Sequence, residues 1–369
     1  MPGAVYSPFA DRAEQQEGSI FPLHVGDTWL EPAVGARMED LRTDEIEGLH
    51  RYLETRGLPA LVDAVLEKVR HRNHVACERE SILITAGATA GLGCALGALL
   101  HPGDEVLILA PFWPLIRGIV TSCGGVPVEV PFFDRVNDPD GAVEAVRAHL
   151  SSRTVALYVS TPSNPTGRVL DGAILAALGD WARREDLWLL SDEVYEDFVY
   201  DAEHVSMATL APERTLTAYS FSKAYGMAGN RVGYVVGPSD WIDEARKLGT
   251  HSFYNAPTAG QHAALRALSQ GASWQAEARA LYAQVGAQAA SLLGIRAPEG
   301  STFLFLNVGE RLDDRGLPGL LEDCFERGVL VAPGASSGED YADWIRLCFT
   351  VLPPEDVLEA VGRIQPLLT

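Results

Sequence analysis

The chain has 369 residues, a net charge of −21 and a hydrophobic fraction of 47%. Its length predicts more than one hydrophobic core, and its hydrophobic fraction is ordinary for a globular protein. The acidic residues are spread along the chain and no basic segment stands out, which argues against a nucleic-acid partner. Five widely spaced cysteines predict neither a disulfide framework nor a zinc site, and the N-terminus lacks the pattern of a signal peptide. We therefore expect a cytoplasmic protein.

One long stretch, residues 81–103, contains no Asp, Glu, Lys or Arg. Its pattern divides into a strand over 82–85 and a helix that begins near Thr89. Such a helix of about 13 residues would measure about 20 Å, whereas the hydrocarbon core of a bilayer is about 30 Å thick. The stretch therefore predicts a buried helix packed on a sheet, and no membrane association is expected.

The middle of the chain alternates apolar runs with helical patterns such as residues 172–184. The apolar runs are predicted as strands over 82–85, 105–109, 126–130, 154–160, 187–191, 215–219 and 231–236. This alternation is typical of an α/β protein with a mostly parallel central sheet and helices on both faces, joined by right-handed crossovers.

After residue 257 the pattern changes to that of a smaller α+β domain. An Ala-rich helical stretch runs from about 258 to 293, and further elements are predicted at 302–308, 317–327, 329–332, 344–349 and 354–367. We expect a large domain over 36–257 and a small C-terminal domain over 258–369. The N-terminal segment, 1–35, is expected to pack on the small domain and the substrate site.

Polar residues follow the predicted strands at the edge of the sheet where ligands bind in open α/β folds. Ser220, Ser222 and Arg231 offer hydroxyl and guanidinium donors to a phosphate, and a helix that starts near Thr89 offers free backbone amides. Trp113 can stack on a ring. Together these groups predict an anionic, planar ligand.

Two further residues at this edge define the chemistry. Lys223 can form a Schiff base with an aldehyde, and Asp192 can keep a heteroaromatic ring nitrogen protonated. Pyridoxal 5'-phosphate requires this combination of a lysine, a carboxylate and a phosphate site.

The stretch from Ser220 to Tyr234, SFSKAYGMAGNRVGY, resembles the signature S-x-S-K-x-x-G-x-x-G-x-R-x-G of the class I/II aminotransferases, which are fold-type-I pyridoxal phosphate enzymes. SNPTG at 163–167 and SDEVYEDF at 191–198 resemble other motifs of that family, in the same order. The resemblance extends from about Phe21 into the C-terminal domain. It implies the fold of the aspartate aminotransferase-like enzymes.

The resemblance also implies which residues surround the cofactor ring. Lys223 would form the Schiff base, and Asp192 would pair with the pyridine nitrogen. Asn164 and Tyr195 would hydrogen-bond the phenolic oxygen, and Trp113 would stack on the ring. Lys223, Asp192 and Tyr195 are the expected catalytic residues.

Phosphate and substrate residues follow from the same resemblance. The expected phosphate ligands are Ala88, Thr89, Ser220, Ser222 and Arg231. Tyr52 matches a tyrosine that reaches the phosphate of the partner subunit, which implies a homodimer with shared active sites. Arg346 would bind the substrate α-carboxylate together with Asn164, and Gly26 would line the substrate pocket.

Several of these residues also have a purely structural interpretation. Asp192 could cap a helix, and Trp113 could be a core side chain. Arg346 could form a surface ion pair, Tyr52 could pack into the core from a helix, and Gly26 could serve only a turn.

The expected function is a ping-pong transfer of an amino group between an L-amino acid and a 2-oxo acid. The same scaffold also supports β-lyases and decarboxylases, so these remain alternatives, as does a non-catalytic domain that senses pyridoxal phosphate. The aromatic residues Trp29, Phe253 and Tyr254 favour an apolar or aromatic substrate.

Overall fold

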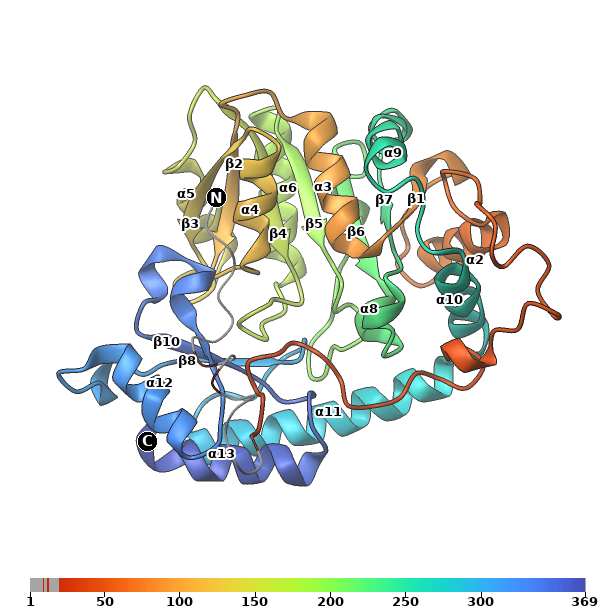
Figure 1. The fold of residues 1–369 in the computed structure, drawn as a ribbon. Helices are drawn as coiled ribbons and strands as arrows, with labels where there is room; N and C mark the ends of the chain where they lie inside the picture. The colour runs from red at the N-terminus through yellow and green to blue at the C-terminus, as the bar shows by residue number, and fades with distance from the viewer. Residues whose placement is uncertain (1–8, 10–11, 13–19, 369) are drawn as a thin grey trace.

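The computed structural model describes Phe9, Arg12 and residues 20–368, and is organised around a seven-stranded sheet (Figure 1). The strands lie in the order β1 (Ile82–Thr85), β7 (Gly233–Val236), β6 (Thr215–Ser220), β5 (Trp188–Asp192), β4 (Thr154–Ser160), β2 (Glu105–Ala110) and β3 (Val126–Pro131). β7 runs antiparallel to both of its neighbours, and the other pairs are parallel. The predicted fold class, a mostly parallel α/β sheet, is confirmed.

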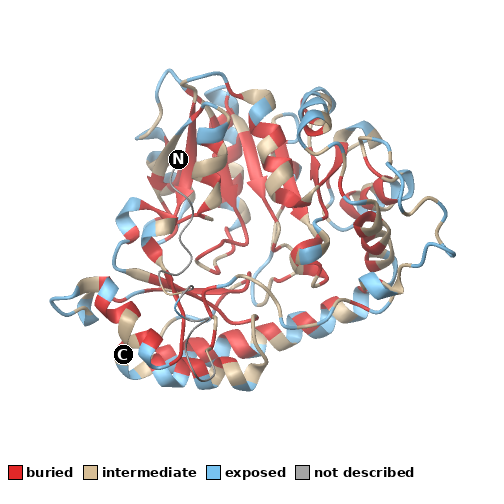
Figure 2. Ribbon diagram, in the orientation of Figure 1, coloured by how far each residue is buried: buried red, intermediate tan, exposed pale blue. Residues whose placement is uncertain are grey.

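Helices cover both faces of this sheet because its central strands are apolar on both sides. In β2, Val106 and Ile108 pack with α3 (Gly87–Leu99), α4 (Leu115–Ser122) and α9 (Ser239–Ser252). Leu107 and Leu109 point the other way and pack with α5 (Pro139–Arg147), α6 (Gly172–Arg184) and α7 (Met207–Leu210). Figure 2 shows the buried residues concentrated in these strands and on the inner sides of the helices.

A local capping signal places the start of α6 where the sequence predicts it. At the start of α6 the carboxylate of Asp171 accepts a hydrogen bond from the backbone N–H of Ala173 at 2.7 Å, which is a helix N-cap. The predicted strand 231–236 begins later, at Gly233, because Arg231 adopts a left-handed backbone conformation with φ of 55°.

A second, antiparallel sheet lies below the large one in Figure 1. Its order is β8 (Phe303–Asn307), β10 (Trp344–Cys348) and β9 (Ala332–Pro333), and it packs with α11 (Ala272–Leu293), α12 (Gly316–Glu326) and α13 (Pro354–Leu368). The predicted strand 329–332 is only partly formed, because Val329 bridges Phe21 instead. This arrangement is the predicted smaller α+β unit.

The predicted helical stretch 258–293 consists of two helices, α10 (Thr258–Gln270) and α11, which are separated at Gly271. A Cβ on Gly271 would lie 2.8 Å from the ring of Tyr225, so glycine allows the close approach at this break. α10 packs with α2 (Pro59–His71), α8 (Phe221–Ala224) and β1, whereas α11 packs on the small sheet. Short 3₁₀ turns lie at Met38–Asp40, Arg79–Ser81, Ala228–Asn230, Gly309–Arg311, Gly334–Ser337 and Glu339–Tyr341.

The described part of the N-terminal segment packs on the small sheet. Phe21 and Leu23 belong to the same apolar cluster as Phe303 and Ile345, while Ala36 already packs with α2 and β1. The division at residues 35 and 257 stays a prediction, and most of residues 1–19 lie outside the described part. Within residues 20–368, each helix is too short or too polar to cross a membrane.

Candidate active site

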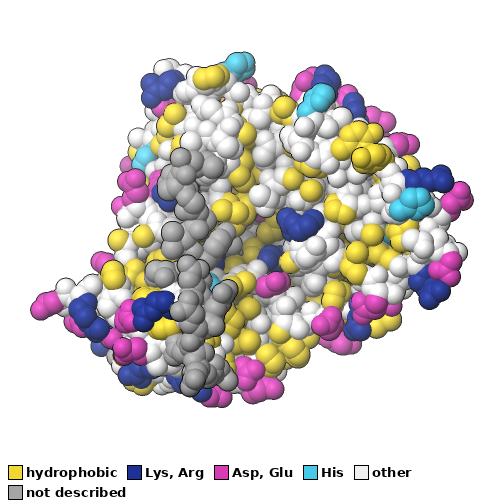
Figure 3. Space-filling model, in the orientation of Figure 1, with side chains coloured by type: hydrophobic (Ala, Val, Ile, Leu, Met, Phe, Trp, Pro, Cys, Tyr) yellow, Lys and Arg dark blue, Asp and Glu magenta, His cyan; other side chains and the backbone are white. Residues whose placement is uncertain are grey.

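A cavity of about 690 Å³ opens between the two sheets, at the ends of β4, β5 and β6 that carry the predicted polar residues. Figure 3 shows this face of the molecule hollowed near its centre, with basic side chains in the hollow. All but one of the predicted site residues line the cavity, namely Gly26, Ala88, Thr89, Trp113, Asn164, Asp192, Tyr195, Ser220, Ser222, Lys223, Arg231 and Arg346.

Asp192 lies at the end of β5 and is almost completely buried. Its Oδ2 accepts a hydrogen bond of 2.6 Å from the hydroxyl of Tyr158 in β4, and its Oδ1 accepts one of 3.4 Å from the backbone N–H of Val194. Burial raises the pKa of Asp192 to about 6, although the hydrogen bond from Tyr158 opposes this rise. A cationic ring N–H placed here would lower the pKa of Asp192 again and so favour the carboxylate further.

Lys223 lies in the short helix α8, directly after β6. Its Nζ donates a 2.5 Å hydrogen bond to the carbonyl of Gly26. Burial lowers the pKa of the Lys223 ammonium, although the carboxylate of Asp27 opposes this effect. Lowering the pKa favours the neutral amine, which is the form that attacks a carbonyl carbon.

The anion-binding end of the cavity combines the first turn of α3 with Ser220, Ser222 and Arg231. The guanidinium of Arg231 donates to the carbonyls of Ala228 at 2.8 Å and Ala86 at 3.4 Å, which holds it beside the start of α3. A Cβ on Gly87 would lie 2.5 Å from Nη2 of this guanidinium, so the guanidinium can lie this close to the start of α3 because residue 87 is a glycine. Backbone N–H groups and a guanidinium are the donors that phosphate prefers.

The opposite end of the cavity is built around Arg346 in β10, which is 3% exposed. Its Nη1 donates to Oδ1 of Asn164 at 3.0 Å, and its Nη2 donates to the carbonyl of His24 at 2.9 Å. The guanidinium lies 4.4 Å from the ring centre of Phe303. Burial therefore excludes the alternative that Arg346 is a surface ion-pairing residue, and its position suits a buried carboxylate.

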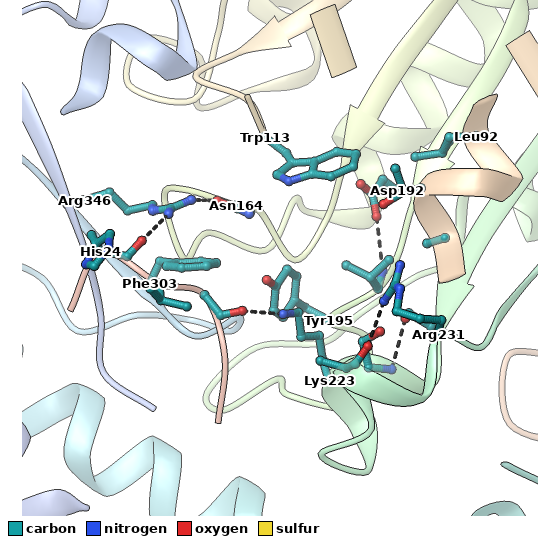
Figure 4. Close-up of a pocket in the computed structure, with 18 residues that line it drawn as sticks. His24, Leu92, Trp113, Asn164, Asp192, Tyr195, Lys223, Arg231, Phe303 and Arg346 are labelled. Atoms are coloured by element: carbon teal, nitrogen blue, oxygen red, sulfur yellow. Dashed lines mark hydrogen bonds between the residues drawn. The ribbon is translucent and has the colours of Figure 1, made fainter. Parts of the chain in front are cut away.

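Aromatic rings border the space between these two ends. Figure 4 shows the indole of Trp113 across the cavity from Tyr195 and Lys223, with Asp192 to one side. The ring of Tyr195 packs edge-on against Phe303, with centroids 5.9 Å apart. A flat ring bound beside Trp113 would lie in the same cavity as the anion-binding groups, the carboxylate of Asp192 and the amine of Lys223.

Comparison with known proteins decides the family. The sequence model of the family "Aminotransferase class I and II" matches residues 22–364. The chain belongs to this family. Its members use pyridoxal phosphate.

Among the similar proteins, an aspartate/prephenate aminotransferase of Thermus thermophilus is 35% identical over 87% of this chain and 84% of that protein. An arginine–pyruvate transaminase of Pseudomonas aeruginosa is 34% identical over 96% of this chain and 91% of that protein. The solved structure of aspartate aminotransferase from Thermus thermophilus with maleate superposes with a TM-score of 0.90, at 30% identity, and covers 100% of this chain and 97% of that one.

Several residues of this aminotransferase that line the cavity were not among the site residues predicted from the sequence. They are His24, Val25, Leu92, Val194, Ala228 and Phe303. Tyr158 is a further residue that the sequence reasoning missed, and its signal is a hydroxyl-bearing ring in the apolar centre of the strand TVALYVS. Close packing, and not only a turn, explains why residue 26 is a glycine, because a Cβ there would lie 2.7 Å from Cζ of Phe303.

Tyr52 is the predicted site residue that does not line the cavity. It lies in a loop, is 82% exposed, and its ring packs against that of Tyr254, with centroids 4.9 Å apart. Core packing from a helix is therefore excluded for Tyr52. Trp29, Phe253 and Tyr254 are likewise not among the described residues that line the cavity.

Proposed function

We propose that this aminotransferase binds pyridoxal 5'-phosphate in the cavity and moves an amino group between an L-amino acid and a 2-oxo acid by a ping-pong mechanism. The observation that carries this proposal is the convergence of Lys223 and Asp192, which are distant in sequence, on one cavity between an anion site and Arg346. The matched family and the aminotransferase relatives support the same activity.

The residues present fit this cofactor. The phosphate would be held by Arg231, Ser220, Ser222 and the first turn of α3, at Ala88 and Thr89. Asp192 would pair with the ring nitrogen, and its hydrogen bond from Tyr158 keeps the carboxylate aimed into the cavity. Trp113 would cover one face of the ring, and Asn164 with Tyr195 would contact the phenolic oxygen.

When bound, the cofactor supplies an electron sink for the Cα carbanion and a carrier for the amino group. The remaining steps belong to side chains. Arg346 and Asn164 would hold the substrate α-carboxylate at one end of the cavity, which places the Cα–H bond near Lys223. Because burial lowers its pKa, Nζ of Lys223 can accept the Cα proton of the amino acid in the first half-reaction. In the second half-reaction it can return a proton to the Cα that derives from the 2-oxo acid.

The decisive test replaces the amine. In Lys223→Ala we expect loss of the visible absorbance of the lysine-bound cofactor and loss of turnover with every amino donor. The matched control is Lys247→Ala, which should behave as the unaltered protein. Lys247 is an exposed lysine in α9 that pairs with Glu244. Turnover that survives in Lys223→Ala would show that the assignment is wrong.

The same assay separates transfer from the alternative reactions. The unaltered protein is mixed with an amino donor and no acceptor. Stoichiometric amination of the cofactor supports transfer, whereas continued release of pyruvate with ammonia, or of CO₂, indicates a β-lyase or a decarboxylase. Tight cofactor binding with no reaction of any donor would support the sensing domain.

The proposal also includes the oligomeric state and the cellular location of the protein. We infer a homodimer in which Tyr52 reaches the phosphate site of the partner subunit, because this tyrosine is exposed and does not line the cavity of its own subunit. We also infer a reducing, cytoplasmic location, because all five cysteines are free. Recovery of the native protein from an exported fraction would contradict that location.

A further inference from the structure

A short N-terminal segment, His24–Gly26, connects the two groups that would bind the ends of the substrate. The carbonyl of His24 accepts from Arg346, and the carbonyl of Gly26 accepts from Lys223. Val25 lies between them, is 40% exposed and lines the cavity. A substrate whose carboxylate meets Arg346 and whose amino group is processed at Lys223 must place its Cα beside this segment.

The charged side chains that line the cavity all have a proposed partner. Among the described lining residues they are Asp192, Lys223, Arg231 and Arg346, which serve the ring nitrogen, the amino transfer, the phosphate and the α-carboxylate. No further acid or base among those residues is left to pair with a charge on the substrate side chain.

Apart from Arg346 and Lys223, the cavity lining beside the segment is uncharged, since Asp27, the next residue, is not among the described residues that line the cavity. Val25 and Phe303 are apolar, and Phe303 packs against Gly26. His24 is neutral near pH 7, because burial and then the charge of Arg346 lower its pKa to about 4. A second carboxylate or an ammonium placed here would lose its water without gaining an ion-pair partner.

We propose that this site selects L-amino acids with an uncharged, apolar side chain, and that Val25 and Phe303 form the surface that contacts it. The inference rests on the proposed aminotransferase function and specifies its substrate class. It departs from the relatives whose names specify aspartate or arginine, each of which has a charged side chain.

The first test measures binding and reaction separately on the cofactor-loaded, unaltered protein. Dissociation constants are determined for 3-phenylpropionate and for maleate, two unreactive acids of which the first carries an apolar ring and the second a second carboxylate. Rates of cofactor amination are determined for phenylalanine, leucine, aspartate and arginine. We expect 3-phenylpropionate to bind at least about tenfold more tightly than maleate. We also expect phenylalanine and leucine to aminate the cofactor at least about tenfold faster than aspartate and arginine.

The outcomes separate this inference from the proposed function. If no donor aminates the cofactor, the proposed function fails, whereas the binding comparison still tests the apolar surface. If donors react but aspartate or arginine is used as well as phenylalanine, only the substrate class is overturned.

The second test adds a cation to the surface. In Val25→Arg, the ratio of the aspartate rate to the phenylalanine rate should rise by about tenfold or more, because the β-carboxylate gains a partner. Val126→Arg is the matched control, since Val126 is 43% exposed on the edge strand β3, and the ratio should not change. An unchanged ratio in a folded, cofactor-loaded Val25→Arg protein would overturn the assignment of Val25.

Discussion

Replacing Tyr158 by Phe tests how the protein sets the charge of Asp192. The substitution removes one buried hydroxyl, whose hydrogen bond to Oδ2 of Asp192 is 2.6 Å long, and leaves the ring in place. A hydrogen bond to a charged acceptor contributes about 1.5–3 kcal/mol. At about 1.4 kcal/mol for each pH unit, the pKa of Asp192 in the cofactor-free protein should rise by about one to two pH units.

The sign of the effect on cofactor binding follows from this rise. In the cofactor-free protein the pKa of Asp192 is already raised to about 6, and the carboxylate is the form that pairs with a protonated ring nitrogen. The affinity for pyridoxal phosphate should therefore fall as the pH drops below this pKa. In Tyr158→Phe the fall should begin about one to two pH units higher.

The assay is a fluorescence titration of cofactor-free protein with pyridoxal phosphate between pH 5 and pH 9. Tyr219→Phe is the matched control, because Tyr219 is a buried tyrosine of the nearby strand β6 whose hydroxyl lies 3.4 Å from Ser206 and has no hydrogen bond to Asp192. If the two variants show the same midpoint of the pH dependence, the argument that Tyr158 sets the charge of Asp192 is refuted.

Two further substitutions test the cavity and its partner. Gly26→Ala places a Cβ 2.7 Å from Cζ of Phe303, so the unfolding free energy should fall by about 1–3 kcal/mol in urea denaturation, and an unchanged midpoint would contradict the close packing. Tyr52→Phe removes a hydroxyl proposed to bind the partner's phosphate, so the dissociation constant of pyridoxal phosphate should rise about tenfold to a hundredfold, with Tyr254→Phe as the control. A molecular mass in solution equal to the 39.8 kDa of one chain would rule out that dimer contact.

Short-range patterns in the sequence determined most of the large sheet. The strands β1 and β4 and the helix α6 have the predicted boundaries, because apolar runs and N-cap residues act over a few neighbouring positions. The same patterns placed Asp192 and Ser220 at strand ends. The motif around Lys223 then indicated the chemistry without any knowledge of strand order.

Long-range packing decided the rest of the site. Arg346 meets Asn164 across 182 positions of the chain and the carbonyl of His24 across 322 positions, and no local pattern encodes such pairs. The break at Gly271 likewise depends on the ring of Tyr225, which approaches from another part of the chain. Local sequence patterns therefore predict which groups end the strands. Which of those groups face each other depends on how two separate sheets pack, so that is set by the folded structure.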